Sequence, residues 1–214
     1  MQITYNSPVV LTYALLCTAI TIVDQTTIQG FAEGLFSVSP YMDWTNPISY
    51  FRLFSHTLGH AGWGHLFNNL TLILLLGPML EEKYGRRSLL IMMLITALVT
   101  GLLNITLFST GLMGGSGIVF MFILLSSLTN FRTGEIPLSF LLVVFIFLGN
   151  EFVSALRADQ ISQFAHIMGG ICGSIFGFRK QTNKQLFEKT SNHVPPSTAF
   201  QMPPSMEDES KKQM

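Results

Sequence analysis

The sequence predicts an all-α polytopic membrane protein, a bundle of six transmembrane helices with both termini in the cytoplasm. Three observations predict it. Only 11% of the 214 residues are charged and 49% are hydrophobic, with a mean hydropathy of +0.45, whereas about a quarter of a soluble domain is charged. Long windows without Asp, Glu, Lys or Arg alternate with short polar connections, and the basic residues gather in connections that would share one side of a membrane.

The uncharged windows give the helices in chain order. A bilayer core of about 30 Å needs roughly 20 helical residues. The window from Ser88 to Phe131 must contain two helices, because a single helix of that length would overrun the membrane and the glycines of 109–117 supply a turn. The apolar N-terminal stretch lacks the basic region and cleavage site of a signal peptide and is read as a retained first span. Helices are expected near residues 9–28, 64–81, 88–108, 116–131, 136–154 and 163–179.

The charges predict orientation and domain boundaries. With six spans both termini share a side, and all of the 12 basic residues except Arg52 and Arg157 fall on that side. Cytoplasmic loops are rich in Lys and Arg, so both termini are placed in the cytoplasm. Residues 1–179 form the predicted membrane domain, and residues 180–214 a disordered cytoplasmic tail. The zero net charge offers no basic excess for nucleic acid.

Polar side chains meet at one predicted depth. The second, fourth and sixth helices run in the same direction, so their first turns lie near the outer face. These turns carry His65 and Asn69, Ser116, and His166 respectively. Polar groups at such depth usually face the bundle interior or a water-filled cavity. The layer is therefore the predicted functional site.

A glycine stripe on the sixth helix would draw this layer together. At about 100° per residue, the glycines lie within about 60° of His166, and small residues at this spacing let membrane helices approach closely. The fourth helix is the expected partner, which would bring His166 next to Ser116. The stripe consists of Gly169, Gly173 and Gly177.

These residue types suit nucleophilic catalysis. A serine hydroxyl needs a neighbouring base, and histidine has a suitable pKa, so Ser116 and His166 form a candidate pair. A helix N-terminus directs free N–H groups towards a developing oxyanion, and His65 and Asn69, four residues apart, could add donors. No acid is placed to orient His166, which favours a dyad over a triad. Flanking glycines permit unusual backbone and close substrate approach; they are Gly114, Gly115 and Gly117.

Four segments in order carry a family resemblance: residues 51–54, 60–69, 114–117 and 165–169 followed by Gly173. Together they resemble the rhomboid intramembrane serine proteases over most of residues 50–178. The resemblance implies that Ser116 is the nucleophile and His166 the general base. It implies that the Ser116 N–H, His65 and Asn69 hold the oxyanion. It also implies cleavage of single-span membrane proteins near the outer end of their helix, where helix-weakening residues let the strand unwind.

The chain departs from the family pattern at two positions. The usual Trp-Arg pair of the first external loop is Phe51-Arg52 here, assigned a structural role in that loop. The aromatic residue one turn after the nucleophile, commonly Tyr, is Phe120, whose ring could still stack on His166. Neither change removes a catalytic group.

Other polar residues receive simpler interpretations. His56, His60 and His65 lack the acidic partner of an HExxH metalloprotease, so neither a metal nor a cofactor is expected. Glu81 and Glu82 are assigned to a solvated cytoplasmic turn. The two cysteines lie in apolar segments and are predicted to be free thiols.

The leading hypothesis is a cofactor-independent serine endopeptidase that acts through an acyl-enzyme on transmembrane segments within the lipid bilayer. It would be a multi-pass protein of a bacterial plasma membrane, with its active site towards the extracytoplasmic side. The alternatives are a non-catalytic rhomboid-like protein that binds membrane helices, and a small transporter that uses the polar layer. No oligomeric state is predicted.

Overall fold

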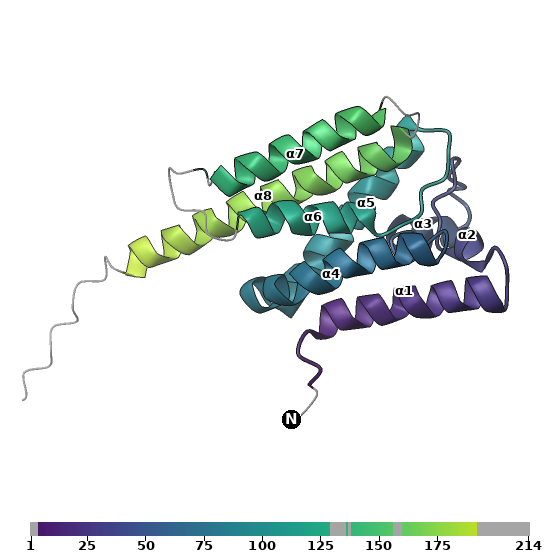
Figure 1. Ribbon diagram of the computed structural model, residues 1–214, viewed down its shortest axis with the longest axis horizontal. Coiled ribbons are helices and arrows are strands. Elements are labelled where there is room, and N and C mark those ends of the chain that lie inside the picture. Colours follow the sequence, from purple (N-terminus) through teal and green to yellow (C-terminus); the bar gives the residue numbers. More distant parts are fainter. Residues whose placement is uncertain (1–3, 129–135, 137, 156–159, 192–214) are drawn as a thin grey trace, which may run out of the picture.

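The computed structural model describes residues 4–128, 136, 138–155 and 160–191, and the regular elements in these ranges are all helices. The one pairing of extended backbone among them is an isolated bridge between Val38 and Leu112. Figure 1 shows the long helices lying side by side, with α6 against α8 and α1 beside α4. The elements are α1 (Pro8–Thr26), α2 (Phe31–Leu35), α3 (Pro47–Ser55), α4 (Trp63–Tyr84), α5 (Arg86–Leu107), α6 (Ser116–Ser127), α7 (Leu138–Ala155) and α8 (Gln160–Ser191).

The all-α class is confirmed, and each of the six predicted ranges overlaps one of the longer helices. The two largest differences are at the ends of α6 and α8. Helix α6 ends at Ser127, earlier than expected. Helix α8 continues to Ser191, into the segment predicted to be a disordered tail, and the rest of that segment lies outside the described residues.

Within the described ranges, α1, α4 and α5 are long and apolar enough to cross a membrane. Helix α6 is apolar but has 12 residues, which extend about 18 Å, well short of a hydrocarbon core of about 30 Å. The six spans and the cytoplasmic termini stay predictions.

Proline and glycine set several helix boundaries. Pro8 and Pro47 stand at the starts of α1 and α3, where a missing N–H costs no helical hydrogen bond. The side chain of Asn46 caps α3 by accepting from the Ile48 N–H at 2.9 Å. Gly85 has a φ of +81°, which glycine adopts without strain, and it turns the chain from α4 directly into α5.

The core lies where α1, α4 and α6 meet. Leu66, Ile73 and Phe122 are fully buried there. A Cβ on Gly77 of α4 would lie 2.7 Å from the Val10 side chain and 3.1 Å from the Phe122 ring. The absence of a side chain at this position therefore lets α4 contact its two neighbours at once.

The three glycines of α8 pack against α6. A Cβ on Gly169 would overlap the backbone of Gly117, and one on Gly173 would overlap the backbone of Met121. A Cβ on Gly177 would lie 2.7 Å from the Leu128 side chain. The two helices thus approach backbone to backbone, in the manner of small-residue interfaces in membranes.

The interpretation of Glu81 as a solvated residue was wrong. Its side chain is buried, and its two carboxylate oxygens accept hydrogen bonds from Val9 N–H at 3.2 Å and Val10 N–H at 3.0 Å. The Arg86 Nε lies 3.8 Å away. The carboxylate satisfies unpaired donors at the start of α1, which the sequence could not reveal because the partners are far apart along the chain.

Replacing Glu81 with Ala is expected to destabilise the protein by about 1.5–3 kcal/mol, because buried N–H groups lose a charged acceptor. Thermal unfolding in detergent micelles measures this change. Glu82→Ala is the matched control, since Glu82 is exposed and should leave the transition unmoved. Equal effects of the two substitutions would contradict the assigned cap.

Candidate active site

The predicted nucleophile begins a helix. Ser116 is the first residue of α6, follows the N-cap Gly115, and is half-buried. The preceding Gly114 has a φ of +136° and donates its N–H to the His56 carbonyl at 2.9 Å. Because a side chain is strained at that φ, glycine is required for the chain to enter α6 in this direction.

Side chains from other helices pack closely against the glycines around Ser116. A Cβ on Gly114 would lie 2.7 Å from the His65 ring, which comes from α4. One on Gly115 would lie 2.7 Å from the Tyr13 hydroxyl of α1. Three helices therefore converge on this turn, and it has no room for larger residues.

Gly117 brings α8 to the same turn. A Cβ on Gly117 would lie 3.3 Å from Thr100 of α5 and 3.4 Å from the Ala165 carbonyl of α8. His166 is the next residue along α8, and Gly169, one turn later, is in backbone contact with Gly117. This packing brings the stretch of α8 that carries His166 against the first turn of α6.

An aromatic contact places the His166 ring more narrowly. Its centroid lies 4.3 Å from that of Phe120, with the planes inclined by 35°. Phe120 follows Ser116 by four residues, so the two share a face of α6. His166 therefore packs over the helix face that begins with Ser116, and it is close enough to His65 to interact electrostatically.

The fourth residue of the predicted layer is Asn69. It lies one turn after His65 on α4 and is only 6% exposed. Its Nδ2 finds no hydrogen-bond partner among the residues that the structure describes. An unused donor in a buried position is costly unless water or a ligand pairs with it.

Two further histidines, His60 and His56, are buried in the connection between α3 and α4. The His60 ring lies 5.0 Å from the His65 ring in a T-shaped arrangement, with Nδ1 3.2 Å from the Leu58 carbonyl. His56 approaches the Arg52 carbonyl through Nδ1 and the Thr100 hydroxyl through Nε2, at 3.2 and 3.3 Å.

Burial lowers the pKa of His56 and of His60 to about 4 in each case, so both rings are neutral at pH 7. Within the described ranges, no group of three His, Cys, Asp or Glu side chains is arranged to hold a metal ion.

Phe51 and Arg52 lie away from this layer, on α3. Arg52 donates to the carbonyl of Gly34 in α2, and the Phe51 ring packs edge-on against Phe36 with centroids 6.0 Å apart. Ser55 of α3 donates to the Leu35 carbonyl at 3.2 Å. These contacts join α3 to α2 and to Phe36 just after it.

With this geometry in hand, comparison with known proteins identifies the family. The model of the Rhomboid domain matches residues 47–181, more than half of the chain. The chain belongs to the rhomboid family. The resemblance noted in the sequence is confirmed, and with it the assignment as an integral membrane protein.

A curated relative supports the assignment. This rhomboid is 26% identical over 153 residues to a protein of Haemophilus influenzae named rhomboid protease GlpG, across 70% of this chain and 80% of the relative. The matched family region includes α3, α4, α5 and α6, and therefore the turn around Ser116.

Sequence reasoning missed several residues that build this site. Tyr13, in the first span of this rhomboid, donates to the Thr57 carbonyl at 2.6 Å and reaches Gly115. Thr100 of α5 contacts both His56 and Gly117. The one available signal was a polar group inside an apolar span, but helix periodicity does not say which distant segment it will meet.

Proposed function

We propose that this rhomboid is an intramembrane serine endopeptidase with a Ser116–His166 dyad. Its substrates would be single-span membrane proteins, cleaved near the outer end of the transmembrane helix. The observation that carries the proposal is the packing of the His166 ring on Phe120, one turn along α6 from Ser116. The backbone contact between Gly169 and Gly117 supports the same pairing.

The reaction follows from the roles of these groups. His166 accepts the proton of the Ser116 hydroxyl, and Oγ attacks the scissile carbonyl to form a tetrahedral oxyanion. His166 then gives that proton to the leaving amine, which leaves an ester on Ser116. A water molecule from the outer side attacks the ester while His166 accepts one of its protons. His166 then returns this proton to Ser116 Oγ as the C–Oγ bond breaks, which frees the acid product and restores the dyad.

Three kinds of donor would stabilise the oxyanion. Ser116 lies at a helix N-terminus, where the first N–H groups have no acceptor within the helix. The His65 ring borders Gly114, and the Asn69 Nδ2 has no partner in the described part of the chain. Donors that are fixed before the reaction stabilise developing charge without reorganisation.

The short α6 supports a site inside the bilayer. A helix that extends about 18 Å from one membrane surface ends within a core of about 30 Å. Ser116 would then lie about 12 Å below the opposite surface, in the outer half of the hydrocarbon core. The proposed setting is a six-span protein of a bacterial plasma membrane, with cytoplasmic termini and an extracytoplasmic active site.

Replacing Asn69 with Ala is expected to lower kcat for a membrane-embedded reporter by about 10²–10³-fold, because one oxyanion donor is lost. Cleavage is followed by gel electrophoresis in proteoliposomes, with thermal unfolding as a check on folding. Asn68→Ala is the control, since Asn68 is exposed and adjacent. Unchanged kcat in a folded Asn69→Ala protein would remove Asn69 from the proposed mechanism.

A further inference from the structure

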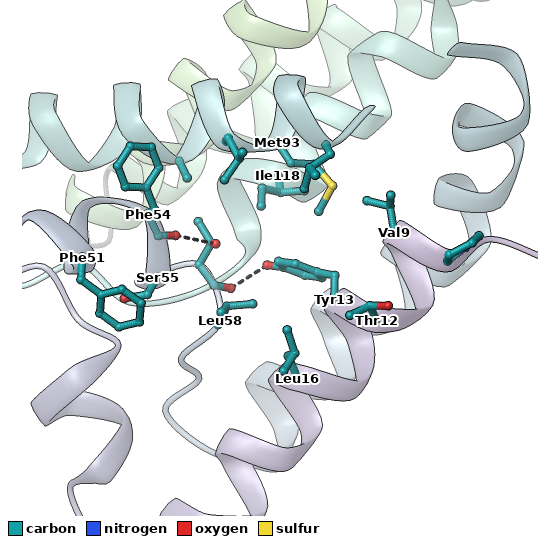
Figure 2. Close-up of a pocket in the computed structure, with 15 residues that line it drawn as sticks. Val9, Thr12, Tyr13, Leu16, Phe51, Phe54, Ser55, Leu58, Met93 and Ile118 are labelled. Carbon is teal, nitrogen blue, oxygen red and sulfur yellow. Dashed lines mark hydrogen bonds between the residues drawn. The ribbon is translucent and has the colours of Figure 1, made fainter. Parts of the chain in front are cut away.

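A hollow in the side of the bundle reaches Tyr13, whose hydroxyl borders the turn before Ser116. A cavity of about 490 Å³ is lined by α1, α3, the connection that follows α3, α5 and one residue of α6 (Figure 2). Its floor is buried and includes Tyr13 and Ile118. Its rim carries large apolar side chains that are nearly half exposed: Leu16 at 47%, Leu90 at 44% and Leu94 at 43%.

The surroundings of this cavity are hydrocarbon. Its two longest walls, α1 and α5, are among the helices long and apolar enough to cross a membrane. The exposed rim therefore faces lipid, and the lining offers few polar partners that would hold water. An apolar occupant is favoured on physical grounds.

The short length of the cavity favours an acyl chain over a protein helix. The lining follows α1 from Pro8 to Leu16 and α5 from Leu90 to Ala97, roughly 10–12 Å along each helix. Phe51 and Phe54 of α3 line the end opposite Val9, so a helix spanning the membrane could not continue through it (Figure 2).

Two arginines lie beyond the end of the cavity that Val9 lines. Leu90 follows Arg86 by four residues and Arg87 by three, which places both arginines one turn away on the same side of α5. Both are exposed, and the Arg86 side chain is 69% exposed although its Nε lies 3.8 Å from Glu81. Guanidinium groups pair well with phosphate.

We infer that this cavity binds one acyl chain of an anionic phospholipid, with the headgroup phosphate near Arg86 and Arg87. The phosphate does not depend on the start of α1, because the Val9 and Val10 N–H groups already donate to Glu81. The bound chain would enter at the membrane surface and reach about a third of the way across the hydrocarbon core.

Such a lipid would contact Tyr13, which packs against the turn before Ser116. Tyr13 forms part of the floor, donates to the Thr57 carbonyl at 2.6 Å, and reaches Gly115 just before Ser116. An acyl chain packed on Tyr13 would restrain this turn from behind. The link to catalysis rests on the proposed function, whereas lipid binding does not.

Photo-crosslinking tests the site without any measurement of activity. The full chain is reconstituted in phosphatidylcholine liposomes with trace phosphatidylglycerol that carries a diazirine in one acyl chain, and crosslinks are mapped by peptide mass spectrometry. Crosslinks are expected on the cavity lining of α1 and α5. Leu94→Trp fills the cavity and should lower the number of these crosslinks by about tenfold. Ile95→Trp is the control and should not lower it. Ile95 is similarly exposed, at 41%, but does not line the cavity.

Competition by unlabelled lipids tests the headgroup. Phosphatidylglycerol should compete better than phosphatidylcholine in the wild type, and Arg87→Gln should reduce that preference. Two results would overturn the site and leave only general contact with bilayer lipid. One is equal crosslinking of the cavity face and the Ile95 face. The other is unchanged crosslinking in a Leu94→Trp protein that unfolds at the wild-type temperature. Equal competition by the two lipids would overturn the preference for an anionic headgroup.

Discussion

Replacing His166 with Ala is expected to reduce cleavage of a membrane-embedded reporter by at least about 10³-fold, because Ser116 loses the base that accepts its proton. The measurement is kcat in proteoliposomes at saturating reporter concentration. Thermal stability should change far less than turnover, because His166 and Phe120 are only half-buried and the substitution removes one ring contact, not a residue of the buried core.

A second substitution separates the base from its packing partner. Phe120→Tyr keeps the ring that packs on His166 at 4.3 Å, so kcat should stay within a few-fold of the wild type. A His166→Ala protein that keeps wild-type turnover would remove the dyad. A Phe120→Tyr protein as inactive as His166→Ala would show that the position next to His166 tolerates no polar group.

Replacing Gly169 with Ala is expected to cause the second large effect. The added methyl group would overlap the backbone of Gly117, so α8 must move away from α6 and carry His166 with it. Overpacking of this kind costs about 1–3 kcal/mol, and a displacement near 1 Å at a reacting group can cost about 10²-fold in rate. Thermal unfolding and reporter cleavage together measure both consequences.

Gly64→Ala provides the matched control. Gly64 is also a helical glycine, but a Cβ there would meet nothing within 4 Å. Because alanine is favoured over glycine within a helix, this variant should be as stable as the wild type or slightly more stable. If Gly169→Ala behaved in the same way as Gly64→Ala, the close approach of α8 to α6 would be contradicted.

Much of this arrangement could be predicted because it depends on local pattern. Uncharged windows located the long helices, and the four-residue spacing from Gly169 predicted a face of α8 that the structure packs on α6. The proposed roles of Ser116 and His166 came from their residue types and from the family motifs. Their joint position follows from the packing of that glycine face.

What could not be predicted depends on contacts between segments far apart along the chain. In the sequence, Glu81 is a charged residue near a helix end, which favours exposure to solvent. In the structure it is buried, and its carboxylate accepts hydrogen bonds from N–H groups at the start of α1. Tyr13 reads as one more apolar residue of the first span, yet its hydroxyl reaches the turn before Ser116. Periodicity gives the face of a helix and does not give its partner.

Covalent labelling by a fluorophosphonate is the most direct measurement of the proposed mechanism, since the probe reacts with an activated serine and needs no knowledge of the substrate. Mass spectrometry of the labelled protein should place the adduct on Ser116, and Ser116→Ala should abolish it. Ser126→Ala is the control, because the Ser126 hydroxyl donates to the Ile123 carbonyl at 2.8 Å and should not react. The predicted result is a single adduct at Ser116 that is lost in His166→Ala. An adduct at another serine, or undiminished labelling of Ser116 without His166, would contradict the Ser116–His166 dyad.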